Sequence, residues 1–562
     1  MLKNISSFTQ KNTRTDSFAC QICLRAPHRG ISPHGLDVRE APLLCQRLLV
    51  LGHDLAVRVL GAIHSENTMP IIHTHELSPD IIHPRNLQIY NGLDTLVTLE
   101  VFEELNRLYN APPDIYSFER ALQAPALEMM LRGFRVDEYA RQKGIALIRE
   151  RIVHLTEVLN EFAFAVWGKP LNPRSHQQLK SFFYDAMRLP EQWTSQKGER
   201  KLSMNRETLE KLELYFHARP IISCILAIRE LAKKLEVLET EISNGRMYTS
   251  YNIAGTESGR WSSSANAFGS GTNLQNIMPE LRVIFVSDEG WVLVGIDLEQ
   301  AESREVGFQC GVLFDDWSYL DACEGGDLHT TTAKLIWPDA LWTGDPKHDR
   351  AIADEPFYRH FSRRDMSKRG GHGSNYLGTP FTMARHLKVP TSLMSTFQGS
   401  YFGVFPGIPR WQRWTAQALQ TTQELTTPFG RRRHFFGRPT DDTTLREAIA
   451  YVPQSSTADR MNLGLWRVWR EMGTRIQILA QVHDAIYFQV RESDDIAAVI
   501  RRALELIDVP LKAPNGRLFS VPGEAKIGWN WGAYDEKLNP DGLRKWKGSD
   551  SRKRQTLMER PL

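Results

Sequence analysis

Two apolar runs that each lead to an aspartate stand out in the hydrophobic pattern of this chain. The first, WVLVGIDL at residues 291–298, is almost wholly apolar until it reaches Asp297. The second, at residues 476–490, predicts two strands around a tight turn at His483 and Asp484. Both regions therefore predict buried β-structure with a carboxylate at a strand end or turn.

Helical periodicity dominates much of the remaining chain. Gly133 is expected to end one helix, Asn172 and Ser175 to cap another, and Asp327 to cap a helix that carries His329. Helices are predicted at residues 90–109, 117–132, 138–165, 206–242 and 444–472.

Polar side chains recur at every fourth position in the segment from 359 to 378. Arg364, Lys368, His372 and Tyr376 would share one face of a helix. Two cations, an imidazole and an aromatic ring suit a triphosphate and a stacked base, although a solvated helix remains the alternative. The three glycines among residues 370–373 indicate close approach by another element.

Composition fits a globular protein with several domains. The chain has 562 residues, a net charge of only +3 and six cysteines, so nucleic-acid affinity would come from local patches and the cysteines indicate a reducing compartment. No apolar run of about 18 residues and no signal peptide is apparent. We expect a cytoplasmic protein with no membrane partner.

An aspartate at the end of a buried strand needs compensation. A divalent cation supplies it when other acids converge, and a solvated turn is the alternative. Glu299 and Glu302 follow Asp297 closely, and Asp484 is the second strand-borne aspartate.

Three further stretches could bind phosphates. The Gly-, Ser- and Asn-rich segment 246–282 carries arginines and amides, Lys233 and Lys234 lie near a helix end, and residues 431–433 form a basic hairpin turn. A solvated surface is the alternative for the lysines and the turn. Residues 1–95 predict a small α/β unit, in which Cys20 and Cys23 are either half a zinc site or buried thiols.

Residues from about 120 to 535 resemble family A DNA polymerases, the bacterial repair and phage replication group. The resemblance rests on collinear motifs: DLEQAESR at 297–304, TESGRWSS at 256–263, NLQNI at 273–277, QVHD at 481–484, and the Arg364, Lys368 and Tyr376 pattern. The truncated form and His372 look more phage-like than bacterial.

The resemblance implies an α+β, multidomain, right-hand polymerase with a thumb, a palm built on an antiparallel sheet, and helical fingers. A small α/β N-terminal region would be the remnant of a ribonuclease-H-like exonuclease domain. The implied domains are an exonuclease-like region at 1–116, thumb and connecting helices at 117–250, palm at 251–300, fingers at 301–426, and palm with C-terminal tail at 427–562.

The same resemblance implies template-directed DNA synthesis from dNTPs on a primer–template, with two Mg²⁺ ions for which Mn²⁺ can substitute. The implied metal ligands are Asp297, Asp484 and the Leu298 carbonyl, with Lys368 as a further catalytic residue. Implied nucleotide contacts are Arg364, Lys368, Tyr376, His329, Glu302, Gln300 and His372, and implied DNA contacts are Arg260, Asn273, Gln275, Asn276, Arg304, Gln481, His483, Lys233 and Lys234. Glu302 would exclude a ribose 2′-hydroxyl. A replication accessory protein is neither indicated nor excluded.

Two departures from the family pattern stand out. Ala485 follows Asp484 where bacterial relatives carry Glu, and His372 stands where Phe or Tyr is usual, which bears on sugar discrimination. In the N-terminal region, Asp94 remains of the exonuclease carboxylates, with Asp54 as a second candidate, and no Asp-x-Glu occurs in residues 1–93. We therefore expect no proofreading, unless another polypeptide supplies the missing strand.

Two other functions stay open at this point. One is a single-subunit RNA polymerase or reverse transcriptase of the same architecture. Glu302 and the QVHD motif argue against the RNA polymerase. The other is a DNA-binding scaffold with a decayed site, which the joint presence of both aspartates, the cations and Tyr376 disfavours.

Overall fold

The computed structural model describes residues 95–101, 103, 113–196, 199–266 and 269–548. The chain divides into two compact units, residues 1–118 and 119–562, and helix α5 (Pro113–Ala121) spans the boundary. Helix is present at residues 95–101. The cysteine pair and the exonuclease-like positions Asp54, Tyr90 and Asp94 lie outside the described residues.

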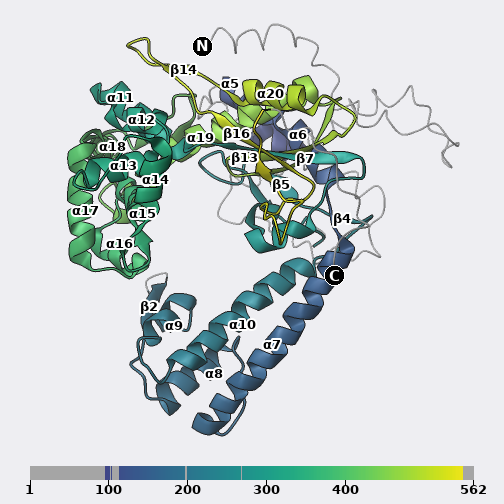
Figure 1. Ribbon diagram of the computed structural model, residues 1–562, viewed down its shortest axis with the longest axis vertical. Coiled ribbons are helices and arrows are strands. Elements are labelled where there is room, and N and C mark those ends of the chain that lie inside the picture. Colours follow the sequence, from purple (N-terminus) through teal and green to yellow (C-terminus); the bar gives the residue numbers. More distant parts are fainter. Residues whose placement is uncertain (1–94, 102, 104–112, 197–198, 267–268, 549–562) are drawn as a thin grey trace, which may run out of the picture. The chain divides into compact units, whose positions relative to one another are not determined.

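A five-stranded antiparallel sheet forms the centre of the second unit. Its strand order is β12–β13–β7–β16–β17 (Figure 1). The bounds are Ile476–Val482 for β12, Ala485–Arg491 for β13, Trp291–Leu298 for β7, Gly523–Gly528 for β16 and Arg544–Lys545 for β17. Both predicted apolar runs are thus neighbouring strands of one sheet, and the predicted hairpin at 476–490 is confirmed.

Side-chain alternation gives the two faces of this sheet different roles. On one face, the side chain of Ile296 lies close to Gly523. The side chains of Leu504 and Ile507, from helix α20 (Ile496–Ile507), lie at the same place. Asp297 follows Ile296 and therefore points to the opposite face. Gly295 interrupts the apolar run because a Cβ there would lie 2.7 Å from the Tyr487 ring on β13.

The second unit has further elements outside this sheet. The longest of them is the mostly buried helix α19 (Asp442–Met472). The others are α6 (Gln123–Arg132), β1 (Phe134–Arg135), β4 (Arg246–Met247), β5 (Ser250–Asn252), β6 (Ser262–Ser264), the 3-10 turns η4 (Leu274–Asn276) and η5 (Pro279–Ile284), β10 (Glu424–Thr426), β11 (Arg432–His434), β14 (Leu511–Lys512) and β15 (Leu518–Phe519).

A helical lobe follows α6 in the sequence. Helices α7 (Glu138–Trp167) and α10 (Arg219–Leu238) pack against each other along their length (Figure 1). Asp137 caps α7 by accepting from the Ala140 amide at 3.0 Å. The lobe also contains α8 (His176–Lys180), the π-helical turn η3 (Ser181–Ala186), the hairpin β2 (Trp193–Gln196) and β3 (Glu199–Leu202), and α9 (Arg206–Leu212).

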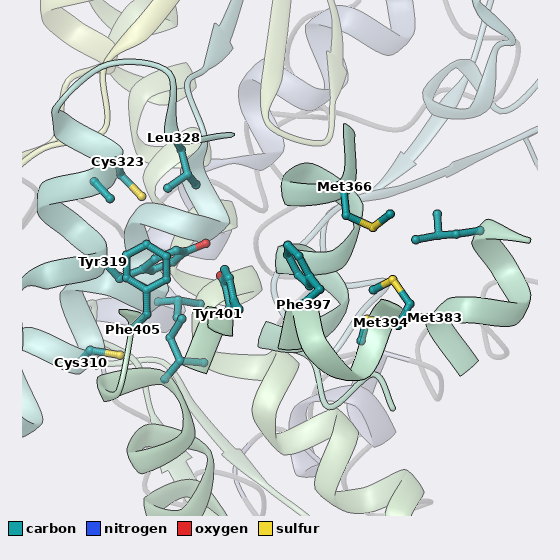
Figure 2. Close-up of a cluster of buried hydrophobic side chains, with 14 of the residues drawn as sticks. Cys310, Tyr319, Cys323, Leu328, Met366, Met383, Met394, Phe397, Tyr401 and Phe405 are labelled. Atoms are coloured by element: carbon teal, nitrogen blue, oxygen red, sulfur yellow. The ribbon is translucent and has the colours of Figure 1, made fainter. Parts of the chain in front are cut away.

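A helical cluster occupies residues 301–421 and has its own core. Figure 2 shows Tyr319, Tyr401 and Phe405 gathered on one side and Phe397 beside Met366 on the other. Its elements are α11 (Ala301–Phe314), α12 (Ser318–Glu324), α13 (Leu328–Ile336), α14 (Pro346–Asp354), β8 (Pro356–Tyr358), β9 (Phe361–Ser362), α15 (Arg363–Asn375), α16 (Pro380–Leu387), α17 (Thr391–Val404) and α18 (Gly407–Thr421).

Two sequence expectations about elements need correction. The single helix predicted at 206–242 is two helices, and Pro220 in the first turn of α10 marks the second start. Tyr376 is not on the helix with the three basic residues, because α15 ends at Asn375 and Tyr376 follows as its cap. The helix forms despite its glycines, and a Cβ on Gly370 would lie 2.5 Å from Phe397, so the close approach predicted there is by α17.

The basic turn at 431–433 is also not a freely solvated surface. Arg431 forms an ion pair with the buried Asp459 of α19 at 2.6 Å and another with Glu119. Arg433 pairs with Glu447 at 2.8 Å and with Glu257. Both arginines are therefore paired with acidic residues of this chain. The sequence analysis considered a solvated turn or a turn that binds phosphates, and it did not foresee that Arg431 and Arg433 contribute to the fold.

Candidate active site

Asp297 on β7 and Asp484, in the turn between β12 and β13, lie at the same end of the sheet. Asp297 is paired in register with Ala485, the residue directly after Asp484. The Leu298 amide donates to the Asp484 carbonyl at 3.0 Å and ties the two positions together. His483 has φ of +56°, a left-handed conformation that is uncommon for a residue other than glycine. The hairpin turn therefore presents Asp484 beside Asp297.

Electrostatics at this pair resemble those of an incomplete cation site. Burial and the neighbouring Asp484 charge raise the pKa of Asp297 to about 6, and burial raises the pKa of Asp484. Among the described residues, neither carboxylate has an ion-pair partner within 4.0 Å. The free energy of the ionised pair would therefore fall if a cation lay between the carboxylates.

The donor set fits a hard divalent ion. Two carboxylates and the nearby Leu298 carbonyl are oxygen ligands of the kind that Mg²⁺ takes, with water completing its coordination. Within the described part of the chain, no group of three or more His, Cys, Asp or Glu side chains is gathered for metal binding. The residues present thus fit an open site with few protein ligands, and they do not form a closed protein cage.

Glu302 joins three predicted site elements. It lies in the first turn of α11, after Gln300 in the left-handed conformation with φ of +53°. Its carboxylate accepts from the Tyr376 hydroxyl at 2.6 Å and forms an ion pair with Arg260. The His372 and Tyr376 rings lie 4.9 Å apart between centroids. The contacts of Glu302 were not foreseen from the sequence, because Arg260 and Tyr376 lie 42 and 74 positions away from it.

Helix α15 carries the predicted triphosphate-binding cations. Ser362 caps the helix through the Asp365 amide, and Arg364, Lys368 and His372 follow at one-turn intervals. The guanidinium of Arg364 forms two hydrogen bonds with the Asp327 carboxylate, at 2.6 and 3.0 Å.

The pKa values of Asp327 and His329 are both lowered, for different reasons and with different results for the charge of each side chain. Burial would raise the pKa of Asp327, but hydrogen bonds from Arg364 and Thr330 outweigh it and lower this pKa to about 2. Burial, helped by the Arg364 and Lys368 charges, lowers the pKa of His329 to about 4 despite Asp327. At neutral pH the carboxylate is therefore charged and the imidazole is neutral.

A cavity of about 380 Å³ opens between α11, α13, α15 and α17. Four of the residues predicted to bind nucleotide lie on its wall, namely Gln300, His329, Lys368 and His372. The wall also includes the aromatic rings of Tyr319 and Tyr401. The structure therefore brings residues from both sides of the predicted nucleotide site to one cavity.

The predicted DNA contacts are placed in several ways. The Gln275 side-chain amide donates to the Gln481 amide oxygen at 2.8 Å, and Gln481 donates to the His483 carbonyl at 2.7 Å. Asn273 accepts from Ser263 at 2.6 Å, and Asn276 ends the short turn η4. These residues form a hydrogen-bonded layer beside the turn that carries Asp484.

The remaining basic residues predicted to contact DNA are largely engaged within the chain. Arg304 is only 7% exposed and donates to the Cys323 carbonyl at 3.1 Å. Lys234 pairs with Glu280 at 2.6 Å and Glu230 at 3.0 Å, and Lys233 lies beside it on α10. Their DNA contacts stay predictions, and the burial of Arg304 is that of a structural residue.

The fold and the site together place this protein in the class of right-hand polymerases. A match to the model of DNA polymerase family A spans residues 145–532, more than half of the chain, and the chain belongs to this family. The family and the fold inferred from the sequence are thereby confirmed; the individual domain boundaries stay predictions.

Curated relatives are bacterial enzymes. The chain is 28% identical to DNA polymerase I of Chloroflexus aurantiacus over 79% of this chain and 46% of the relative. It is also 28% identical to the thermostable DNA polymerase I of Thermus thermophilus, over 78% and 51% respectively. The chain thus spans about half the length of the curated relatives it matches.

Among solved structures, one similar fold is the polymerase domain of Pol1 from M. smegmatis in complex with DNA primer-template and dNTP. The TM-score is 0.60 at 23% identity, with coverage of 85% of this chain and 78% of the other. Among the helices that the structure describes, none has the length and apolar character needed to cross a membrane.

Proposed function

We propose that this protein is a DNA-directed DNA polymerase that adds dNMPs to the 3′-hydroxyl of a primer on a DNA template. The observation that carries the proposal is the pair Asp297 and Asp484, two half-buried carboxylates at one end of the sheet, neither of which has an ion-pair partner within 4.0 Å among the described residues. Membership of family A and the cation-bearing face of α15 near the cavity support the same reaction.

Metal binding is the first element of the proposed mechanism. Asp297, Asp484 and the Leu298 carbonyl would hold two Mg²⁺ ions, for which Mn²⁺ can substitute. When bound, the ions supply activation of the primer hydroxyl and neutralisation of charge on the triphosphate.

The nucleotide would be bound by residues of the helical cluster. Arg364 and Lys368 bind the triphosphate as fixed cations. His329, neutral at pH 7, donates a hydrogen bond to a phosphate oxygen and adds no charge. Gln300 and His372 contact the nucleotide from the wall of the same cavity.

Sugar and primer would be positioned by the contacts around Glu302. Its carboxylate, held by Tyr376 and Arg260, occupies the place where a ribose 2′-hydroxyl would need room. Tyr376 would then border the new base pair, and Arg260 would contact the primer terminus. The layer formed by Gln275, Gln481 and His483 supports the primer terminus.

We also propose that the chain lacks proofreading. A 3′–5′ exonuclease of the two-metal type needs about four carboxylates, and residues 1–93 contain no Asp-x-Glu. The whole reaction can be tested by primer extension with purified protein, using matched and mismatched 3′ ends and dNTPs against NTPs.

The expected result is Mg²⁺-dependent extension of matched primers with dNTPs and no shortening of mismatched ends. Absence of extension by folded protein would refute the polymerase assignment. Shortening of the 3′ end would refute only the statement on proofreading, and preferential use of NTPs would point to an RNA polymerase.

A further inference from the structure

One carboxylate connects two of the proposed triphosphate-binding side chains. Asp327 accepts from Arg364 Nε at 2.6 Å and from Arg364 Nη2 at 3.0 Å. The same carboxylate caps α13, where it accepts from the Thr330 amide at 3.2 Å and from the Thr330 hydroxyl. Asp327 therefore makes hydrogen bonds to two different helices, α13 and α15.

The geometry of the Arg364 guanidinium leaves it able to bind a second anion. A guanidinium presents five N–H groups in a rigid plane, and Asp327 occupies only the edge formed by Nε and Nη2. The next acid is Asp354, whose carboxylate lies 4.0 Å from Nη1, beyond hydrogen-bonding distance. The edge formed by Nη1 and Nη2 thus keeps donors for a phosphate.

Burial makes the orientation of Arg364 well defined. The side chains of Arg364 and Asp327 are 19% and 24% exposed, so water screens their interaction less than it screens a surface pair. Loss of the carboxylate would leave the long arginine side chain free to change rotamer, and ordering it again on binding costs entropy.

His329 is placed through the cap of its own helix. It is the second residue of α13, one position before the Thr330 amide that Asp327 binds. His329 lines the cavity together with Lys368, and Arg364 lies one helical turn before Lys368 on α15.

We propose that Asp327 is a positioning residue for the nucleotide triphosphate: it holds Arg364 with one edge free and fixes the helix that presents His329. This inference rests on the proposed polymerase function, and it adds a residue that the sequence identified only as a helix cap. If the Asp327 carboxylate only repelled the triphosphate, removing its charge would strengthen dNTP binding. The proposal predicts instead that removing it weakens dNTP binding.

The test is Asp327→Asn, because asparagine caps helices about as well as aspartate but loses the charge and one acceptor. We expect KM for dNTP in primer extension to rise about tenfold, with kcat changed less than about threefold and Tm unchanged. Asp327→Ser, which also caps but does not reach Arg364, should give the same increase. The matched control is Asp354→Asn, which removes a neighbouring carboxylate that lies 4.0 Å from Arg364 and should leave KM within about twofold.

A double-mutant cycle identifies the route of the effect. If Asp327 acts through Arg364, the Asp327→Asn change should weaken dATP binding to a dideoxy-terminated primer–template in wild type and much less in an Arg364→Lys background. Unchanged or tighter dATP binding by Asp327→Asn, a loss of Tm in both variants, or additive effects in the cycle would each overturn the proposal. If the wild type fails to extend primers, the polymerase function fails, and the binding cycle still reports on Asp327 by itself.

Discussion

Two sets of carboxylates close to the central sheet differ in how their charge is compensated. Glu305 of α11 is fully buried and receives hydrogen bonds from Arg460 of α19 at 2.9 and 3.1 Å, and Arg460 is fully buried as well. Asp297 and Asp484 are also partly withdrawn from water, but each has the other carboxylate as its neighbour and no ion-pair partner among the described residues.

This difference separates a structural role from a functional one. A carboxylate that has its cation within the chain contributes to the fold and offers nothing to a ligand. A carboxylate pair without such a cation raises the free energy of the folded protein, and a bound external cation removes that cost. Such a pair therefore indicates a site that binds a cation for function. Arg431 and the buried Asp459 belong to the first kind.

The largest expected effect concerns the uncompensated pair. Asp297→Asn and Asp484→Asn should each lower the rate of primer extension by about a thousandfold, because each removes a proposed metal ligand. Stability should not fall at pH 7 and should rise by about 1–2 kcal/mol for Asp297→Asn, because like-charge repulsion and burial of a charge are relieved.

Glu299→Gln is the matched control for these variants. Glu299 lies two residues from Asp297 and its amide bonds the Pro522 carbonyl, so its loss should change the extension rate by less than about threefold. Retained extension in either asparagine variant would show that the pair is not the metal site.

The compensated pair should give the reverse result. Arg460→Met leaves Glu305 buried without its partner and should destabilise the fold by about 3–5 kcal/mol in urea unfolding. Adding Glu305→Gln should restore part of that loss, since the buried charge is then gone. Equal stability of wild type and Arg460→Met would mean that the comparison between the two sets is wrong.

Glu302 tests whether the acid next to the pair acts on the sugar. Glu302→Ala should increase NMP incorporation relative to dNMP by about tenfold, because the carboxylate proposed to exclude the 2′-hydroxyl is removed. Single-nucleotide insertion with dNTP and NTP measures this ratio, and Glu299→Ala is the control. A ratio equal to that of wild type would refute the role of Glu302 in sugar selection.

The smallest effect is a dependence on pH. Because the pKa of Asp297 is raised to about 6, the folded metal-free protein takes up a proton there as pH falls, and that proton competes with Mg²⁺. Extension should therefore decline several-fold from pH 7 to pH 5.5 at low Mg²⁺, and higher Mg²⁺ should move the decline to lower pH. The stability of the metal-free protein should change oppositely, decreasing as pH rises through 6. A decline that does not move with Mg²⁺ would argue against this competition.

The sequence predicted those features whose causes are local. The apolar runs and the two-residue turn predicted Asp297 on a strand and Asp484 in a hairpin turn, and the cap before His329 was predicted from Asp327 alone. The family resemblance then supplied the roles of the residues on α15, which helical spacing alone left open.

Contacts between distant segments could not be predicted in this way. The partners of Arg431 and Arg460, Asp459 and Glu305, lie 28 and 155 positions away, so a basic turn and a lone glutamate gave no sign of them. The contact of Tyr376 with Glu302 spans 74 positions and depends on how α11 and the end of α15 are arranged within the helical cluster. Local pattern fixes which element a side chain is on, and tertiary packing decides what it meets.

Metal binding without substrate tests directly whether Asp297 and Asp484 form the metal site. Titration of the purified, metal-free protein with Mn²⁺, followed by electron paramagnetic resonance, should show binding in wild type and in Glu299→Gln. It should show binding weakened by at least about tenfold in Asp297→Asn and in Asp484→Asn. Equal Mn²⁺ binding by wild type and both asparagine variants would contradict the account.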